Sequence, residues 1–418
     1  MKYSELSIMQ AEDLDRKIII TQVVIRKAFA LSKKPALAFS GGKDSTVLLH
    51  LILLTEPEKS AGMPIIYGNT GVEFPECVSF ARGIAKDWNL NLYEAHPSKT
   101  TEPGLKYKAQ RELLDTIRSQ GRISEILKPD GKLKSTRTLE QFLPDNFPQF
   151  EKYRLVWPAG TLMSYWWCAD QYGYPLLGKA WSKLDARRIN IDVFLSYSQS
   201  VSTDPVLLSY YKVLRQVKIS QHCCRVLKKE PSQLVQADLG VDLIFKGLMA
   251  SESRSRAKNF LTRGWLFEGA QKPYLNGEPF FHCQPLATWN EKDIWDYIHR
   301  FSVPYSTLYD IGYISHDGSR KNIRRNGCMG CATDLAYKDN HLFALRQTHP
   351  RAWKVFMRSG LGQEIRNLQH ILRTNQMDIF DVFPTNELID AQPCIFDDLD
   401  GLGGKPELST DLTYDPEL

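Results

Sequence analysis

The chain has 418 residues, of which 43% are hydrophobic and 24% are charged, and its formal net charge is +5. This length favours two or three domains, and the composition is ordinary for a globular enzyme. No apolar run reaches the roughly 18–20 residues that a membrane helix needs, and the opening Met-Lys-Tyr-Ser-Glu-Leu lacks the apolar region of a signal peptide, so we expect a cytoplasmic protein without membrane contact.

The first hundred residues alternate between apolar strands and helical segments. A helix is expected over residues 11–32, where apolar side chains recur at helical spacing. Strands follow at 35–39, 64–67 and 90–95, and they are separated by helices at 42–54 and 74–88. This order, with helical crossovers, implies an α/β fold with a doubly wound parallel sheet. Phosphate ligands of such sheets bind beyond the C-terminal ends of the strands.

The rest of the chain is less regular. We expect a polar helical insertion at 99–150, an aromatic-rich helical region at 160–222, a strand at 241–249 and a helix at 290–300. The expected parts are an N-terminal helix (1–34), an α/β domain (35–260), a helical cysteine-bearing subdomain (261–386) and an acidic tail (387–418). The tail carries nine acidic residues and one lysine, so the remainder has a net charge of +13. A basic body of this kind suits nucleotides or nucleic acid.

The sequence Ser-Gly-Gly-Lys-Asp-Ser at residues 40–45 lies where the first strand gives way to a helix. Gly41 and Gly42 let the backbone approach a ligand, and amides at a helix N-terminus then face an anion. Lys43 adds a positive charge, and Ser40 and Ser45 add hydroxyl groups. Asp44 would either hold Mg²⁺ or cap the helix. The spacing is not that of the common P-loop, but the residues predict a phosphate site.

This loop resembles the Ser-Gly-Gly-x-Asp-Ser loop of the ATP pyrophosphatase superfamily, whose fold is of the adenine nucleotide alpha hydrolase type. The resemblance implies that the chain binds ATP and Mg²⁺ and cleaves ATP between its α- and β-phosphates. It also implies that Lys43, Asp44 and Ser45 serve catalysis, and that all six loop residues hold the pyrophosphate.

Three further stretches resemble the phosphoadenylyl-sulfate (PAPS) reductase family, which is a branch of that superfamily. IYGNTGVEFPE (66–76) resembles its Asp-Thr-Gly-x-x-Phe-Pro-Glu segment, and GLMASESRSRA (247–257) its Gly-x-Arg-x-x-Glu-Ser-x-x-Arg segment. PLATWNEKDIWDYI (285–298) resembles a third segment, which is rich in tryptophan. The resemblance adds these nucleotide-binding candidates: Asn69, Thr70, Gly71, Glu252, Ser253 and Arg256. Asn69 replaces the usual Asp, and Met249 stands where an arginine is common.

Two cysteine pairs stand out among the eight cysteines. Cys223 and Cys224 are adjacent, and Cys328 and Cys331 form a Cys-x-x-Cys pair. Thiolates are soft ligands that select zinc or iron–sulfur clusters, and a vicinal pair suits the larger cluster. The set resembles the Cys-Cys…Cys-x-x-Cys ligands of iron–sulfur adenylyl-sulfate (APS) reductases, and it is similar to DndC/SspD-type proteins of DNA phosphorothioation. We expect a [4Fe–4S] cluster on these four cysteines, with a structural zinc as the alternative and Cys168 as a possible substitute ligand.

Several basic residues precede the second cysteine pair: Arg320, Lys321, Arg324 and Arg325. They would either offset the charge of a cluster or contact a phosphate, and a solvated basic loop is the simpler alternative. The sequence does not choose among these roles.

The tail lacks the Glu-Cys-Gly-x-His segment with which PAPS and APS reductases attack their substrate. Its one cysteine, Cys394, has acidic neighbours, which raise a thiol pKa and weaken the nucleophile. The sequence therefore favours activation chemistry, that is, an ATP pyrophosphatase that acts in sulfur transfer. The resemblance to DndC/SspD-type proteins implies DNA as the acceptor, and a cysteine desulfurase and other sulfur-transfer subunits as partners. The alternatives are a sulfonucleotide reductase that releases sulfite, a non-catalytic nucleotide-binding subunit and, ranked lower, a tRNA thiolation enzyme.

Overall fold

The computed structural model describes residues 2–105, 119–122, 156–176, 220, 222–333 and 339–374. Most of the insertion expected at 99–150, the acidic tail at 387–418 and Cys394 lie outside the described residues. The same is true of most of the helical region expected at 160–222, of which α9 (Tyr165–Tyr172) is described. Within the described part, no helix combines the length and the hydropathy needed to cross a membrane.

A six-stranded sheet forms the centre of the molecule, in the order β3-β2-β1-β6-β8-β7. Its strands are β1 (Pro35–Phe39), β2 (Pro64–Gly68), β3 (Asn91–Ala95), β6 (Leu243–Lys246), β7 (Leu266–Glu268) and β8 (Phe281–Cys283). The first five in spatial order pair in parallel, and β7 pairs antiparallel to β8 at the edge. The expected parallel α/β fold is therefore confirmed.

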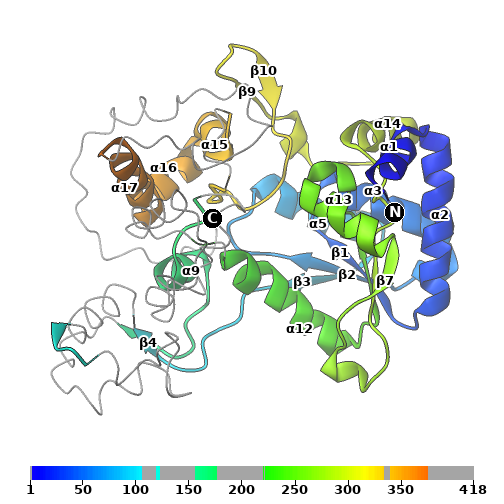
Figure 1. The fold of residues 1–418 in the computed structure, drawn as a ribbon, viewed down its shortest axis with the longest axis horizontal. Helices are drawn as coiled ribbons and strands as arrows, with labels where there is room; N and C mark the ends of the chain where they lie inside the picture. The colour runs from blue at the N-terminus through cyan, green and yellow to red at the C-terminus, as the bar shows by residue number, and fades with distance from the viewer. Residues whose placement is uncertain are drawn as a thin grey trace.

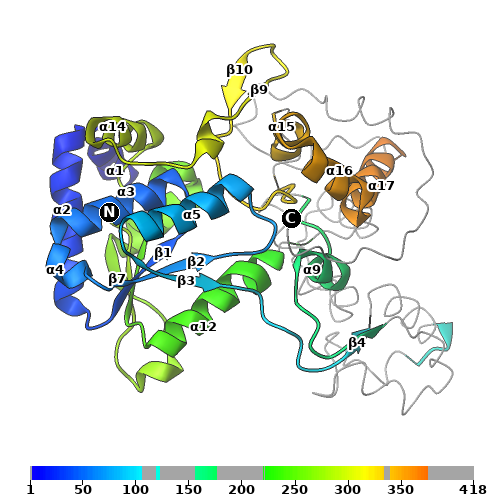
Figure 2. The same cartoon turned by 180° about the vertical axis from the view of Figure 1, so that it is seen from behind.

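Helices cover both faces of this sheet (Figures 1 and 2). One face packs against α2 (Leu14–Leu31), α3 (Lys43–Thr55), α5 (Pro75–Asp87) and α14 (Glu291–Phe301). The other face packs against α12 (Glu230–Leu239). Because both faces are covered, β1 reads as an unbroken apolar run, Pro-Ala-Leu-Ala-Phe, rather than as an alternating one.

A second apolar core lies beside the sheet and contains three of the cysteines. It is formed by α9, residues 222–229, and α15 (His341–Thr348), α16 (Pro350–Arg358) and α17 (Gly360–Thr374), and it buries Cys168 and Cys223. Figure 2 shows these helices grouped to one side of the sheet. Phe74 and Cys77, at the start of α5, join this second core to the sheet.

The remaining described elements are short. They are α1 (Tyr3–Ala11), α4 (Pro57–Ser60), α13 (Arg254–Arg263), β4 (Gly104–Leu105), β5 (Val156–Trp157), β9 (Gly312–Ile314), β10 (Arg320–Asn322), a π-helical turn at Arg225–Lys229 and 3-10 turns at Ala250–Glu252, Pro273–Leu275 and Thr307–Asp310.

The structure places the boundaries of several elements differently from the sequence prediction. The helix expected from residue 11 begins at Leu14, because Asp13 caps it by accepting a hydrogen bond of 2.8 Å from the Arg16 amide. The strands β7 and β8, which the sequence prediction missed, join the central sheet, so the sheet continues beyond the domain boundary expected at 260/261.

Candidate nucleotide site and cysteine cluster

The glycine-rich loop connects β1 to α3 at the C-terminal edge of the parallel strands, where ligands of such sheets bind. Gly41 has a φ of +66°, and a Cβ there would lie 3.0 Å from the Cys77 carbonyl oxygen, so only glycine fits without strain. The hydroxyls of Ser40 and Ser45 bond within the loop: Ser45 Oγ donates to the Gly42 carbonyl at 2.9 Å and accepts from the Ser40 amide at 3.2 Å. The two serines therefore shape the loop.

Backbone amides remain for a ligand. The Gly42 amide donates to Ser40 Oγ at 3.2 Å and the Lys43 amide to the Tyr309 hydroxyl at 3.2 Å. Within the described part of the chain, the amides of Gly41, Asp44 and Ser45 have no hydrogen-bond acceptor. Amides in this position at a helix N-terminus suit a phosphate.

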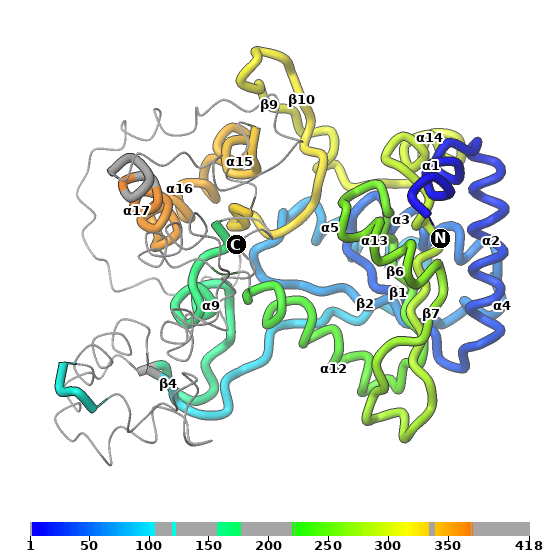
Figure 3. The backbone as a smooth tube through the Cα atoms, in the orientation of Figure 1, coloured from blue at the N-terminus to red at the C-terminus, as the bar shows by residue number. Residues whose placement is uncertain are grey.

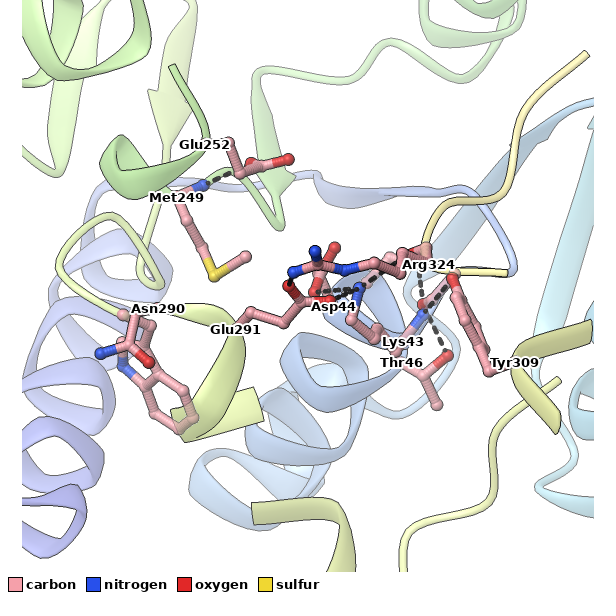
Figure 4. A network of polar contacts seen from close by, with 12 residues as sticks. Lys43, Asp44, Thr46, Met249, Glu252, Asn290, Glu291, Tyr309 and Arg324 are labelled. Atoms are coloured by element: carbon pink, nitrogen blue, oxygen red, sulfur yellow. Dashed lines mark hydrogen bonds and ion pairs between the residues drawn. The ribbon is translucent and has the colours of Figure 1, made fainter. Parts of the chain in front are cut away.

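The Lys43 side chain is buried and lies among groups from distant parts of the chain (Figure 4). Its Nζ is 3.5 Å from Glu291 Oε1 and 3.8 Å from Asp44 Oδ1, and it donates to the Arg324 carbonyl at 3.2 Å. Nζ also lies 5.2 Å from the centre of the Tyr309 ring. Glu291 in turn forms an ion pair with Arg324. The site therefore joins the loop, the start of α14 and the segment that precedes the second cysteine pair.

Asp44 is a perturbed acid of this site. Its Oδ1 is buried without a hydrogen-bond partner among the described residues, and burial raises the pKa of its carboxyl, while Lys43, Arg256 and Arg325 oppose that rise. The N-cap of α3 is Gly42, so of the two roles expected for Asp44 the capping role is not observed. A buried carboxylate oxygen that accepts no hydrogen bond from the described residues, beside several cations, fits a site that Mg²⁺ and phosphate oxygens would complete.

The stretch after β6 contacts the loop directly. A Cβ at Gly247 would lie 3.1 Å from the backbone of Asp44 and of Ser45, so the two segments touch through their main chains. Of the candidates there, Ser253 caps α13, and Glu252 accepts a hydrogen bond from the Met249 amide at 3.0 Å.

The last candidate after β6, Arg256, pairs with Glu252 and also interacts with Asp44. Because burial lowers its pKa and its charge faces the loop, Arg256 is the member of this group best placed for a phosphate.

The end of β2 explains the unusual Asn69. Its side-chain amide donates to Glu94 Oε2 at 3.1 Å, and its Oδ1 accepts from the Gly71 amide at 3.0 Å. An aspartate here would place a second carboxylate beside Glu94. Thr70 Oγ1 lies 3.4 Å from the sulfur of Cys328, so this strand end meets the cysteines.

The four cysteines expected as ligands lie in one region. Residues 328–331 form a turn, in which the Cys331 amide donates to the Cys328 carbonyl at 3.0 Å. The hydrogen bond between the vicinal thiols raises the pKa of Cys223 and lowers that of Cys224 to about 6. Cys331 is half-buried, and desolvation of its thiol raises its pKa to about 12, with Cys328 and Cys224 adding to the rise. The sulfurs are thus close enough to perturb one another's titration.

No set of three or more Cys, His, Asp or Glu side chains within the described ranges is already arranged around a metal ion. The donor chemistry does fit an iron–sulfur cluster or zinc, since the four residues supply thiols that interact electrostatically with one another, and Lys228 interacts with Cys224 and Cys328. Cys168 is completely buried and interacts with Cys223, so it stays a nearby alternative donor.

Sequence reasoning did not assign Glu291, Tyr309 or Asn326 to the site. Asn326 Nδ2 donates to the Ser40 carbonyl at 2.7 Å, and its side chain occupies the space beside the Gly42 α-carbon. Of the basic residues before the second cysteine pair, Arg324 and Arg325 face the nucleotide loop, whereas Lys321 pairs with Asp339 at 2.7 Å. For Asn326, the sequence offered one indication of a role: the polar Asn-Gly pair directly before the Cys-x-x-Cys motif.

The structure thus combines a mostly parallel α/β sheet with a glycine-rich loop at the C-terminal edge of its strands and with four cysteines nearby. The family profile of the phosphoadenosine phosphosulfate reductase domain matches residues 34–139 and 183–333, and the chain belongs to this family.

Curated relatives match over shorter stretches. The chain is 36% identical over 100 residues to an adenosine 5'-phosphosulfate reductase of Allochromatium vinosum, which covers 24% of this chain and 34% of that protein. It is 35% identical over 71 residues to a sulfate adenylyltransferase subunit 2 of Rhizobium tropici, which covers 17% and 22%. The chain thus spans about a third or less of the length of these relatives.

Two solved structures are similar at a low level. The PAPS reductase of Candida auris in complex with phosphate aligns with a TM-score of 0.31 at 14% identity, over 69% of this chain and 83% of that one. The U34-tRNA thiolase NcsA of Methanococcus maripaludis with its [4Fe-4S] cluster aligns with a TM-score of 0.30 at 12% identity, over 85% and 80%. At these scores neither structure bears on the activity of this chain.

Proposed function

We propose that the protein is an ATP pyrophosphatase that activates an acceptor oxygen for sulfur transfer, with the DNA backbone as acceptor, in the manner of DndC/SspD-type proteins of DNA phosphorothioation. The observation that carries this proposal is the loop at residues 40–45. Its amides at Gly41, Asp44 and Ser45 have no acceptor in the described part of the chain, and Lys43, Arg256 and Arg325 converge on it.

The proposed reaction has an activation step followed by a sulfur step. A non-bridging oxygen of the acceptor attacks the α-phosphorus of ATP, and pyrophosphate leaves onto the loop amides and Lys43. Charge that develops on the leaving group is stabilised there, and Asp44 would hold the Mg²⁺ that shares this charge. A persulfide from a cysteine desulfurase then displaces AMP. A second thiol cleaves the S–S bond, which leaves sulfur on phosphorus and a disulfide behind.

We further propose that Cys223, Cys224, Cys328 and Cys331 hold a [4Fe–4S] cluster, which would supply electron or sulfur transfer when bound. The support is that the four thiols interact electrostatically and that the sulfur of Cys328 lies 3.4 Å from Thr70 Oγ1 at the end of β2. Protein purified without oxygen should contain about four iron and four sulfide per chain. Zinc without sulfide would instead establish the structural zinc alternative.

The deciding experiment identifies the products made from α-labelled ATP, with and without DNA and a cysteine desulfurase. We expect AMP-type products and pyrophosphate, and loss of both in Lys43→Met. Lys292→Met removes the same charge from an exposed i,i+4 pair with Asp296 on α14 and serves as the matched control. ADP and orthophosphate, or equal activity in the two variants, would overturn the proposal.

The sequence identity to adenosine 5'-phosphosulfate reductase favours a second candidate, a sulfonucleotide reductase. Sulfite release from APS or PAPS with thioredoxin, lost in Cys394→Ser, would establish it in place of the first. ATP that binds tightly and is never cleaved, with or without DNA, would instead establish a non-catalytic nucleotide-binding subunit.

A further inference from the structure

A group of basic side chains that the proposed reaction does not use lies at the β6–β8 part of the sheet. This β6–β8 basic cluster consists of Lys229, Lys246, Arg263, Lys272 and His282. Lys246 ends β6 and His282 is the central residue of β8, and their side chains meet with Lys246 Nζ 3.1 Å from His282 Nδ1. In Figure 3, β6 and β7 lie on the side of the molecule opposite α16 and α17.

At the centre of the cluster, Lys246 and His282 interact with cations and with no carboxylate of the described residues. Lys246 is partly buried, and burial together with Lys272 and Lys229 lowers its pKa to about 8. Burial, Lys246, Lys272 and Arg263 likewise lower the pKa of His282 to about 4, so His282 is neutral near pH 7 and accepts from the lysine. No acidic side chain of the described chain perturbs either group.

Other enclosed lysines of this protein do have acidic partners. Lys17 pairs with Asp293 at 2.7 Å, and Lys43 pairs with Glu291 at 3.5 Å. A desolvated lysine without such a partner is costly for the free protein. The exception at Lys246 therefore indicates a missing anion.

Aromatic rings hold the cluster in place. Arg263 lies 5.2 Å from the centre of the Phe267 ring, which lies 5.2 Å from the His282 ring. The centres of the His282 and Phe280 rings lie 5.0 Å apart, and Lys272 Nζ lies 5.0 Å from the centre of the same Phe280 ring. This chain of ring contacts fixes cations at separate points along the β7–β8 edge, before any ligand arrives.

We propose that the β6–β8 basic cluster binds the phosphodiester backbone of a nucleic acid. Charges spread along an edge match the spaced phosphates of a polymer better than they match one small anion. The residue after Lys246 is Gly247, which touches the backbone of the nucleotide loop, so a strand bound here runs next to the place where ATP would react. The proposal deepens the proposed function, on which it rests for DNA as the polymer.

The test is DNA binding by the full chain in the absence of ATP, with a labelled duplex and a labelled single strand, at several salt concentrations between about 50 and 200 mM. Lys246→Met and Lys272→Met should each weaken binding several-fold and lower the slope of log affinity against log salt by about 0.7–0.9. Lys292→Met, which removes an exposed charge on α14, should change neither quantity. Unchanged affinity and slope in both cluster variants would overturn the proposal.

Three further readouts keep the outcome unambiguous. Thermal melting should show that Lys246→Met is at least as stable as the natural chain, since the substitution removes a charge without an acidic partner. A loss of stability would contradict the missing-anion argument.

Inorganic phosphate at matched ionic strength should compete with DNA no better than chloride does. Displacement of DNA by phosphate at that ionic strength would identify a free-anion pocket and overturn the proposal. Failure of the proposed function is detected by a different measurement from failure of this proposal. Pyrophosphate release is lost in Lys43→Met whether or not DNA binds to the β6–β8 basic cluster, so that assay does not depend on the DNA-binding result.

Discussion

Gly41→Ala is the sharpest structural test of the loop. The new Cβ meets two obstacles. A φ of +66° costs a non-glycine residue about 1–2 kcal/mol. The Cys77 carbonyl oxygen, 3.0 Å from the Cβ position, adds an overpacking cost of about 1–3 kcal/mol because it is backbone and cannot swing away. The free energy of unfolding should therefore fall by about 2–5 kcal/mol.

Gly62→Ala is the matched control. Gly62 has a similar φ of +75°, but its Cβ position is 3.6 Å from the nearest atom, a side-chain nitrogen of Asn91. This variant should lose only the backbone cost, about 1–2 kcal/mol. Urea unfolding measures both losses. Repeating it with saturating ATP, which should stabilise the natural chain by about 2.7 kcal/mol at one hundred times Kd, reports binding.

The gain in stability with ATP should persist in Gly62→Ala and shrink in Gly41→Ala, because the added methyl group turns the loop amides away from a phosphate. Equal losses of stability in the two variants, together with equal gains from ATP, would refute the reasoning about this loop.

The remaining predictions concern polar pairs. Arg82 donates to Glu94 at 2.6 and 3.0 Å, and these hydrogen bonds hold the Glu94 pKa below its usual 4.5. The stability that the pair contributes is therefore complete above pH 4.5 and is lost as the pH falls through the lowered pKa. Arg82→Leu should therefore destabilise by under about 1 kcal/mol at neutral pH and not in acid, as urea unfolding at several pH values would show; an equal loss in acid would contradict this. Asn69→Asp should cost about 1–3 kcal/mol at neutral pH, because a donor to Glu94 becomes a like charge, and a neutral outcome would count against the assigned contact. Lys17→Met leaves Asp293 enclosed without its partner and should cost about 3–5 kcal/mol in the same assay, whereas a loss under about 1 kcal/mol would show that the pair is dispensable.

The sequence was sufficient to predict the strands and the loop whose structure depends on neighbouring residues in the chain. The strands at 35–39 and 64–67 are continuous apolar runs bounded by turn residues, and the loop between β1 and α3 needs glycine at a positive φ. The strands β7 and β8 have three residues each, which is too short for periodicity to reveal.

The site contacts that sequence reasoning missed join residues far apart in the chain. The bond from Asn326 to Ser40 spans 286 residues, and the burial of Lys43 between Glu291 and Tyr309 likewise depends on tertiary packing. Spacing within one segment carries no information about such pairs. The substitution of Asn at position 69 also became interpretable only when Glu94 was found beside it.

The segment from Arg324 to Cys328 connects the two halves of the proposed chemistry. Its first residue accepts from Lys43 through the main chain, and Asn326 donates to the carbonyl of Ser40. Only two residues later, Cys328 contacts Thr70 and forms a bridge with Glu73. A ligand that moves the nucleotide loop therefore acts on the segment 324–328, whose last residue begins the Cys-x-x-Cys turn. This continuity is the physical reason for assigning ATP activation and thiol chemistry to one site rather than to two independent ones.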